Sequence, residues 1–356
     1  MARPLFAWPR PVGEPSAGAR TPSSETTDLV AWVASMRGTV AVAIACVAWL
    51  LAPSAQAQPM TVGDDDPGSP PDPLVRVIPI PRTDNRFGGD DPTEWRPRRT
   101  MQATTADLFV TGGAAGVAIA AAIVPPSSKH ARGGVLFDEG ARDFLRIGSP
   151  DGRYLVRDAS DVGVSLASTW PFLVDALLTA WWHRGDVKLA RNMALVSAEA
   201  FMLSAAAQGM TNTLAGRERP YGRLCGTDQL PENGVDCQGN VRYRSFFSGH
   251  STLSFTSAGV LCVNHLGLGL LGGPWDAVTC VTGFGVATST ALFRVMSDMH
   301  YATDVTVGAI VGTSVGLLVP WLHLGPPPGT PEIERAGRID VRVAPVGQGI
   351  GLTGTF

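Results

Sequence analysis

The sequence predicts an all-α protein, a bundle of about six apolar helices of membrane-spanning length, followed by a small β-like C-terminal tail. Two observations indicate this fold. Hydrophobic residues make up 45% of the 356 residues and charged residues only 17%, and the apolar residues gather in long runs separated by short polar breaks. The helices are expected near 106–124, 161–182, 188–214, 250–271, 276–295 and 304–323. The net charge of −3 gives no electrostatic reason to expect a nucleic-acid partner.

The N-terminal part divides into three segments. Residues 1–35 are rich in Pro and Ser without periodicity, which indicates either an unstructured segment or a start codon assigned too early. Residues 36–57 combine Arg37, a short apolar run and an Ala-Gln-Ala cleavage motif, which predicts a secretory signal peptide or, alternatively, a short anchor helix. Residues 58–104 are rich in Pro and Asp and are expected to be an extended linker.

A helical domain is expected over 105–324 and a tail over 325–356. Within the domain, the charged stretch 137–161 carries four arginines and is expected to include a short amphipathic helix. The tail alternates apolar and polar residues before a Gly-rich end, which predicts a strand, a turn and a second strand.

The clearest chemical pattern lies between the last two apolar runs. His300 and Asp304 are four residues apart, so they share one face of a helical turn. A carboxylate in this position can accept the proton of one ring nitrogen and leave the other nitrogen free as a nucleophile. Arg294, six residues before His300, can direct its guanidinium at an oxyanion beside the ring.

Two further clusters also lie at the ends of apolar runs. Ser248, Gly249 and His250 begin a helix, where backbone N–H groups, a hydroxyl and an imidazole face the positive end of the helix dipole. Arg219 precedes Pro220, where a helix has to end, and can extend past that end. The three clusters predict a site at which several donors converge on one phosphate.

These motifs resemble those of the type 2 phosphatidic acid phosphatase and vanadium haloperoxidase superfamily, over residues 107–321. The family pattern is Lys-x6-Arg-Pro, Pro-Ser-Gly-His and Ser-Arg-x5-His-x3-Asp. The chain departs from it at Asn212, Phe247 and Phe293, which replace the lysine, the proline and the serine. We expect Asn212 to line the phosphate pocket and Arg217 to supply the missing cation.

The resemblance implies a phosphatase that acts on a phosphomonoester or diphosphate without a metal. His300 would attack phosphorus and form a phosphohistidine, Asp304 would orient it, and His250 would act first as an acid and then as a base. The phosphate oxygens would be held by Arg219, Arg294, Ser248 and Gly249. A lipid phosphate such as phosphatidate, or an isoprenyl diphosphate, is the substrate class that the family implies.

Two alternatives remain open. The same pocket can hold vanadate as a phosphate mimic, which would make the protein a vanadium-dependent haloperoxidase. The three departures from the motifs also fit a non-catalytic helical envelope protein with a degenerate site. No metal-ligand spacing appears, no cofactor is expected, and no pattern indicates an oligomeric state.

The cysteines bear on the compartment. Cys225 and Cys237 flank a polar loop between the first two motifs, and a disulfide there would place the site outside the cytoplasm, as an exported N-terminus also implies. Cys262 and Cys280 lie inside apolar helices and are expected to be buried thiols. The predicted location is the cell envelope, in or on the inner membrane with the site facing the periplasm, or alternatively a soluble periplasmic bundle.

This location conflicts with the helix count. Three crossings after an exported N-terminus would place Arg219 in the cytoplasm, so one of the first three helices is expected not to cross. The helix 188–214 is the costliest to bury in lipid because it carries Arg191 and Glu199. If it stays outside, the arginine-rich stretch 137–161 falls on the cytoplasmic side, as the positive-inside rule favours.

The remaining titratable residues show no partner pattern. Asp175 and Glu199 are either functional carboxylates or internally paired. The histidines expected at the surface or at helix ends are His130, His183, His265 and His323.

Overall fold

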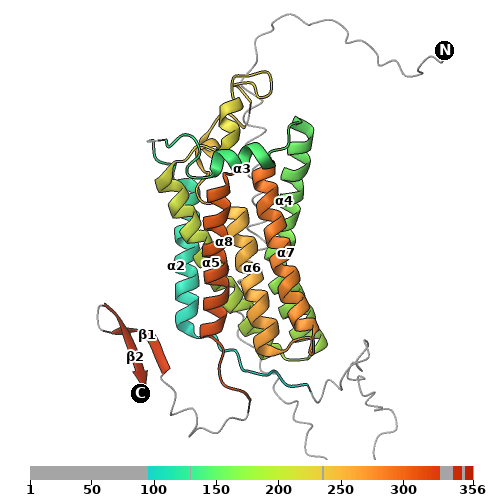
Figure 1. Cartoon of the computed structure of the whole chain (residues 1–356). Coiled ribbons are helices and arrows are strands. Elements are labelled where there is room, and N and C mark those ends of the chain that lie inside the picture. The colour runs from blue at the N-terminus through green and yellow to red at the C-terminus, as the bar shows by residue number, and fades with distance from the viewer. Residues whose placement is uncertain (1–94, 129, 235, 329–339, 347–348, 356) are drawn as a thin grey trace, which may run out of the picture. The chain divides into compact units, whose positions relative to one another are not determined.

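Long antiparallel helices form the core of the computed structural model, which describes residues 95–128, 130–234, 236–328, 340–346 and 349–355 (Figure 1). They are α2 (Thr105–Ile123), α4 (Pro150–Trp170) with its π-helical continuation η1 (Pro171–His183), α5 (Val187–Ala215), α6 (Gly249–Cys262) with η4 (Val263–Leu268), α7 (Trp275–Met296) and α8 (Ala302–Leu322). Shorter segments are α3 (Asp138–Leu145), η2 (Pro220–Leu224) and η3 (Asn240–Tyr243). The predicted all-α fold is confirmed.

The tail contains two strands, β1 (Asp340–Val346) and β2 (Gly349–Thr355), which pair in antiparallel register with Asp340 opposite Thr355. The predicted segments 1–35 and 36–57, and all of the predicted linker before residue 95, lie outside the described residues.

The stretch 137–161 differs from the expected layout. α4 begins at Pro150 because Ser149 accepts a hydrogen bond from the N–H of Gly152 and the proline occupies the first turn. The helix then continues through η1 to His183, so the stretch contributes α3 and the first turns of α4. α3 lies across the upper end of the bundle in Figure 1.

α5 packs within the bundle, beside α2 and η1. Its C-terminal end meets that of α2, where the Thr213 hydroxyl donates to the carbonyl of Ala121 (3.1 Å). Inside the bundle, its Asn192 amide donates to the carbonyl of Met101 (2.7 Å). This hydrogen bond satisfies a polar group that would find no partner among lipid chains. α5 is one of five helices with the length and composition to cross a membrane.

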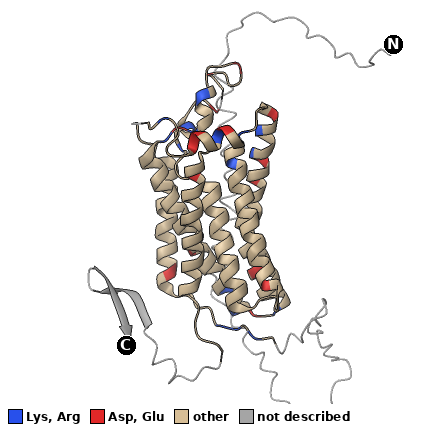
Figure 2. Ribbon diagram, in the orientation of Figure 1, with Lys and Arg blue, Asp and Glu red and all other residues tan. Residues whose placement is uncertain are grey.

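The outer faces of the helices are strongly apolar, whereas charged side chains gather toward the bundle ends, most densely at the upper end (Figure 2). Large hydrophobic side chains on α2, α4, α7 and α8 are more than half exposed. Examples are Phe109, Ile119, Leu155, Val281, Ile310 and Leu318. Apolar surface of this extent on several helices indicates membrane association.

A glycine seam brings α6 and α8 into close contact. Gly308, Gly312 and Gly316 recur every four residues on α8 and face α6; a Cβ on Gly308 would lie 2.8 Å from the carbonyl oxygen of Ser248. Such small residues let two helix backbones approach closely. As a result, the N-termini of both helices lie side by side, and the Ser248 N–H donates to the carbonyl of Asp304 (3.1 Å).

α6 is also tied to α7. Cys262 and Cys280 form a disulfide with their Cα atoms 4.4 Å apart, so the prediction of two free thiols was wrong. The sequence indicated only that each residue lies in an apolar helix, whereas the pairing depends on which faces the two neighbouring helices present to each other.

Candidate active site

Four helix ends meet at the upper end of the bundle: the C-terminal ends of α5 and α7 and the N-terminal ends of α6 and α8 (Figure 1). Gly216 ends α5 in the left-handed conformation (φ 53°), and a Cβ there would lie 2.7 Å from the carbonyl oxygen of Ser127. This turn takes the chain out of α5 and brings Arg217 and Arg219 to the other three helix ends.

His300 lies just before α8 and is only 2% exposed. Its Nδ1–H donates to the carbonyl oxygen of Ser245 (2.8 Å), which fixes the tautomer and leaves the Nε2 lone pair free. Burial lowers the pKa of His300 well below its ordinary value, and the positive charges of Arg219 and Arg294 lower it further. The ring is therefore neutral near pH 7, as a nucleophile has to be.

Asp304 lies one turn after His300 but is not its hydrogen-bond partner. The distance from its Oδ2 to His300 Nδ1 is 3.7 Å. The carboxylate accepts hydrogen bonds from the Ser245 hydroxyl (2.6 Å), the Tyr301 N–H (2.9 Å) and the Arg217 guanidinium (2.6 Å). Asp304 thus acts on His300 through Ser245, which offers its hydroxyl to the carboxylate and its carbonyl to the ring.

Arg217 lies behind Asp304 rather than in the expected phosphate-facing position. Its guanidinium bridges Asp304 and Asp138 (2.7 Å) and lies over the Tyr301 ring, 4.2 Å from the ring centre. Burial alone would raise the pKa of Asp138, but hydrogen bonds from the Val135 N–H and Arg217, among others, bring it below its ordinary value. The charge of Arg217 is therefore shared between two carboxylates.

Asn212, which replaces the motif lysine, is almost fully buried. Its amide N–H donates to the carbonyl of Phe247 (3.2 Å), which also accepts from Gln208 (3.1 Å). The Asn212 Oδ1 atom has no hydrogen-bond partner. In this arrangement Asn212 holds the backbone that precedes Ser248.

Two arginines carry unpartnered donors at the centre of the site. The Nε atoms of Arg219 and Arg294 are buried without a hydrogen-bond partner. Burial lowers the pKa of Arg219. Because buried donors are nearly always hydrogen-bonded in native proteins, these atoms indicate a site for an anion.

The N-terminus of α6 completes the set of donors. The Ser248 hydroxyl oxygen accepts from the Ser251 N–H (3.4 Å) and caps the helix, which leaves the hydroxyl hydrogen available to a ligand. Gly249 follows at the first helical position, where N–H groups point out of a helix end. A phosphate bound there would also face the positive end of the α6 dipole.

His250 is held by a residue that the sequence did not indicate. Its Nε2 atom lies 2.7 Å from Oδ1 of Asp161 on α4, and the same oxygen accepts from Arg294 (3.1 Å). Asp161 belongs to no motif and lies 89 residues from His250. In the sequence, Asp161 was distinguished only by its position at the charged end of an otherwise apolar helix. Asp151 and Asp158 share that position, so the sequence could not single out Asp161.

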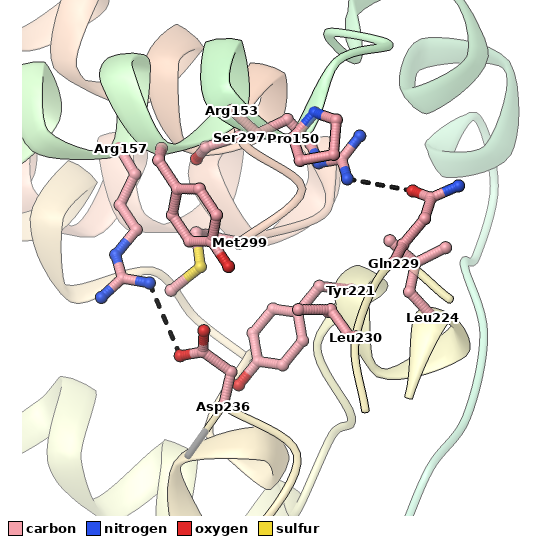
Figure 3. Close-up of a pocket in the computed structure, with 11 residues that line it drawn as sticks. Pro150, Arg153, Arg157, Tyr221, Leu224, Gln229, Leu230, Asp236, Ser297 and Met299 are labelled. Atoms are coloured by element: carbon pink, nitrogen blue, oxygen red, sulfur yellow. Dashed lines mark hydrogen bonds and ion pairs between the residues drawn. The ribbon is translucent and has the colours of Figure 1, made fainter. Parts of the chain in front are cut away.

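A pocket opens beside these residues, between α4, the loop after Arg219 and the turn before His300 (Figure 3). Arg157 pairs with Asp236 across it (3.5 Å). The residues that line it are Pro150, Arg153, Tyr154, Arg157, Tyr221, Leu224, Gln229, Leu230, Asp236, Ser297 and Met299. Its mixture of cations, aromatic rings and leucines fits a ligand with a polar and an apolar part.

The loop that forms one wall of this pocket is closed by a disulfide. Cys225 and Cys237 are joined, with their Cα atoms 5.6 Å apart, so the segment that carries Gln229, Leu230 and Asp236 is anchored at both ends.

Residues 193–325 match the family model described as the PAP2 superfamily. The match covers part of the helical domain. The matched segment contains the sequence motifs from Asn212 to Asp304, so the match rests on the same helix ends that form the site. Asp161, by contrast, lies before the matched segment.

A curated protein to which part of the chain is similar is the lipid A 1-phosphatase of Porphyromonas gingivalis, which is 37% identical over 78 residues. This alignment covers 22% of the chain and 16% of that relative. No solved structure matches the chain.

Proposed function

We propose that the protein is a phosphatase that hydrolyses a lipid phosphate or diphosphate through a phosphohistidine on His300. The observation that carries this proposal is a buried, neutral imidazole with a free Nε2 atom, beside Arg219 and Arg294 with their unpartnered Nε donors. A nucleophile next to fixed positive charge is the arrangement that phosphoryl transfer requires.

In the first step, Nε2 of His300 attacks phosphorus and the bond from phosphorus to the leaving oxygen breaks. Burial and the nearby Arg294 lower the pKa of His250 to about 4, so the negative charge of the bound phosphate has to raise it before His250, held by Asp161, can donate a proton to that oxygen. The ring of His300 keeps its Nδ1–H on the Ser245 carbonyl throughout, so the positive charge that develops on the ring is spread toward Ser245 and Asp304.

In the second step, the now neutral His250 takes a proton from water, the water oxygen attacks phosphorus, and the N–P bond breaks to release phosphate. In both steps the three non-bridging oxygens carry the charge that has to be stabilised. The donors placed for them are Arg219, Arg294, the Ser248 hydroxyl and the Gly249 N–H. Every group in this scheme is an imidazole, a carboxylate or a donor of the chain, so no metal is assigned a role.

A lipid substrate is supported by two observations. The site lies at the ends of apolar helices of membrane-spanning length, so in a membrane it would lie near the lipid headgroups, and the neighbouring pocket combines Arg153 and Arg157 with Leu224 and Leu230. The name of the Porphyromonas gingivalis relative also refers to a lipid phosphate. The Cys225–Cys237 disulfide favours an oxidising compartment, and hence a site on the periplasmic side.

The test is phosphate release by purified protein in the presence of a chelator, from phosphatidate, an isoprenyl diphosphate, lipid A and a soluble aryl phosphate. His300→Ala should abolish release, whereas the exposed His130→Ala serves as the matched control. A phosphoryl group trapped on the wild-type protein, and absent from His300→Ala, would identify the intermediate.

Other outcomes would overturn the proposal. Bound vanadium with halide oxidation and no phosphate release would favour the haloperoxidase alternative. A folded protein that releases phosphate from none of these substrates would favour a degenerate site.

A further inference from the structure

A second cluster of titratable side chains lies at the opposite end of α8 from His300. It consists of Asp107 in the first turn of α2, Glu199 on α5 and His323 at the C-terminal end of α8. One ligand atom from each lies within 4.8 Å of the others. Since α8 has 21 residues, the cluster is about 30 Å from the candidate active site. It therefore belongs to a different part of the protein.

The buried carboxylate of Glu199 and the half-buried carboxylate of Asp107 lack a matching cation. Glu199 is 7% exposed, and its Oε2 atom, which faces His323, accepts no hydrogen bond. Among the described residues, no lysine or arginine pairs with Asp107 or Glu199. One buried and one half-buried carboxylate beside one imidazole leave negative charge that has to be neutralised.

His323 presents a free ring nitrogen to both carboxylates. Its Nδ1–H donates to the carbonyl of Val319 (2.8 Å), so in the neutral ring Nε2 carries a lone pair. Nε2 lies 3.2 Å from Asp107 Oδ2 and 3.4 Å from Glu199 Oε2. Ligand atoms bound to a tetrahedral Zn²⁺ at 2.0–2.1 Å are about 3.3 Å apart. An N–H donated to a backbone carbonyl is also the usual support of a metal-binding histidine.

The cluster is held in place by its surroundings. The Thr104 hydroxyl donates to Oδ2 of Asp107 (3.0 Å) at the start of α2. Two chain segments cross beside His323, where the Gln102 N–H donates to the His323 carbonyl (3.1 Å) and Met101 pairs with Leu324. The three ligands come from different helices, so an ion between them would join α2, α5 and α8.

We propose that Asp107, Glu199 and His323 bind one divalent transition-metal ion of the Zn²⁺ type, which stabilises the bundle at the end away from the candidate active site. The donor set of one imidazole and two carboxylates suits such an ion. The ion would carry a structural role, with water completing its coordination. This proposal does not depend on the proposed phosphatase activity.

The test uses the full-length protein, purified in detergent with a tag that contains no histidine, and stripped with a chelator. Zn²⁺ is then added, and bound zinc per chain and the thermal unfolding midpoint are measured. The expected result is one zinc per chain and a rise of several degrees in the midpoint at saturating Zn²⁺. Bound Co²⁺ should show the strong visible absorption of a tetrahedral site.

Glu199→Gln and His323→Gln should each lose the bound ion and the zinc-dependent shift. Glu199→Gln removes one of two neighbouring negative charges. Without metal, its thermal unfolding midpoint should therefore be at or above that of the stripped wild type, which shows that the variant folds and separates loss of zinc binding from loss of folding. The exposed His130→Gln should behave as the wild type. Equal zinc binding by wild type and both cluster variants, or no binding and no shift in the wild type, would overturn the proposal.

Discussion

His300 donates its Nδ1 hydrogen to the backbone carbonyl of Ser245, 2.8 Å away, while the carboxylate of Asp304 lies 3.7 Å from the same nitrogen. The carboxylate instead accepts the hydroxyl hydrogen of Ser245 (2.6 Å). Ser245 therefore connects His300 to Asp304, through its main-chain carbonyl and its side-chain hydroxyl. A backbone carbonyl fixes the tautomer without adding a second negative charge beside the ring.

The pH dependence of activity follows from the state of His300. Because burial and two arginines lower its pKa, protonation removes the nucleophile only at a pH well below 6.5. The acid limb of kcat/KM should therefore lie below pH 6.5. Arg219→Gln removes one of the positive charges, so in this variant the residual activity should show an acid limb at higher pH. An acid limb of the wild type at or above pH 6.5 would contradict this assignment.

Asp161 should be a positioning residue for His250. Asp161→Asn keeps the size of the side chain but removes the charge that pairs with His250 and Arg294. We expect kcat to fall by about ten- to a hundredfold, which is part of the roughly 10²–10⁴-fold that proton transfer by a positioned group contributes, because the imidazole itself remains in the variant. Asp158→Asn, an exposed carboxylate on the same helix, is the control. The measurement is steady-state kinetics of both variants. Equal kcat values for Asp161→Asn and Asp158→Asn would show that Asp161 does not position His250.

Arg217 should affect stability more than substrate binding. Arg217→Ala leaves Asp304 and Asp138 buried without their cation, and removing one partner of a buried pair costs about 3–5 kcal/mol. We expect a lower unfolding midpoint and a lower kcat. Arg132→Ala, which removes an exposed partner of Glu218, should change the midpoint little. An Arg217→Ala variant of wild-type stability with a raised KM would instead favour direct contact with phosphate.

The glycine seam should determine the geometry of the site. A methyl group on Gly312 would overlap the carbonyl oxygen of Thr252 and push α8 away from α6, which carry Asp304 and Ser248 at their N-termini. Gly312→Ala should lower both the unfolding midpoint and kcat. Gly285→Ala on α7 meets nothing within 4 Å and should lower neither. Equal effects of the two substitutions would indicate that helix propensity, not the close approach, governs the result.

Features that depend on the spacing of nearby residues could be predicted from the sequence. Apolar runs predicted the long helices, and the interval between His300 and Asp304 placed both residues at one helix end. Contacts between distant segments were not predictable in this way. Asp161 reaches His250 from another helix, and the Cys262–Cys280 disulfide depends on how two helices face each other.

Arg217 shows a second reason why the sequence could not predict the arrangement of the site. Its position near the motif was clear, but a guanidinium on a long side chain can extend in several directions. The left-handed turn at Gly216 and the buried Asp138 determine that it extends toward Asp304. Neither feature has a signature in the spacing of the motif itself.

The passage of the chain through the bundle has a consequence for membrane sidedness. α2, α4 with η1, and α5 each run from one end to the other before the chain reaches Arg219, and an odd number of traverses inverts the side. Trp95 and Pro328 therefore lie at one end of the bundle, and His300 lies at the other. If the helices span a membrane and the oxidised Cys225–Cys237 loop marks its outer face, Trp95 lies at the cytoplasmic face. A reporter fused before α2 and one inserted in that loop should then read out opposite compartments.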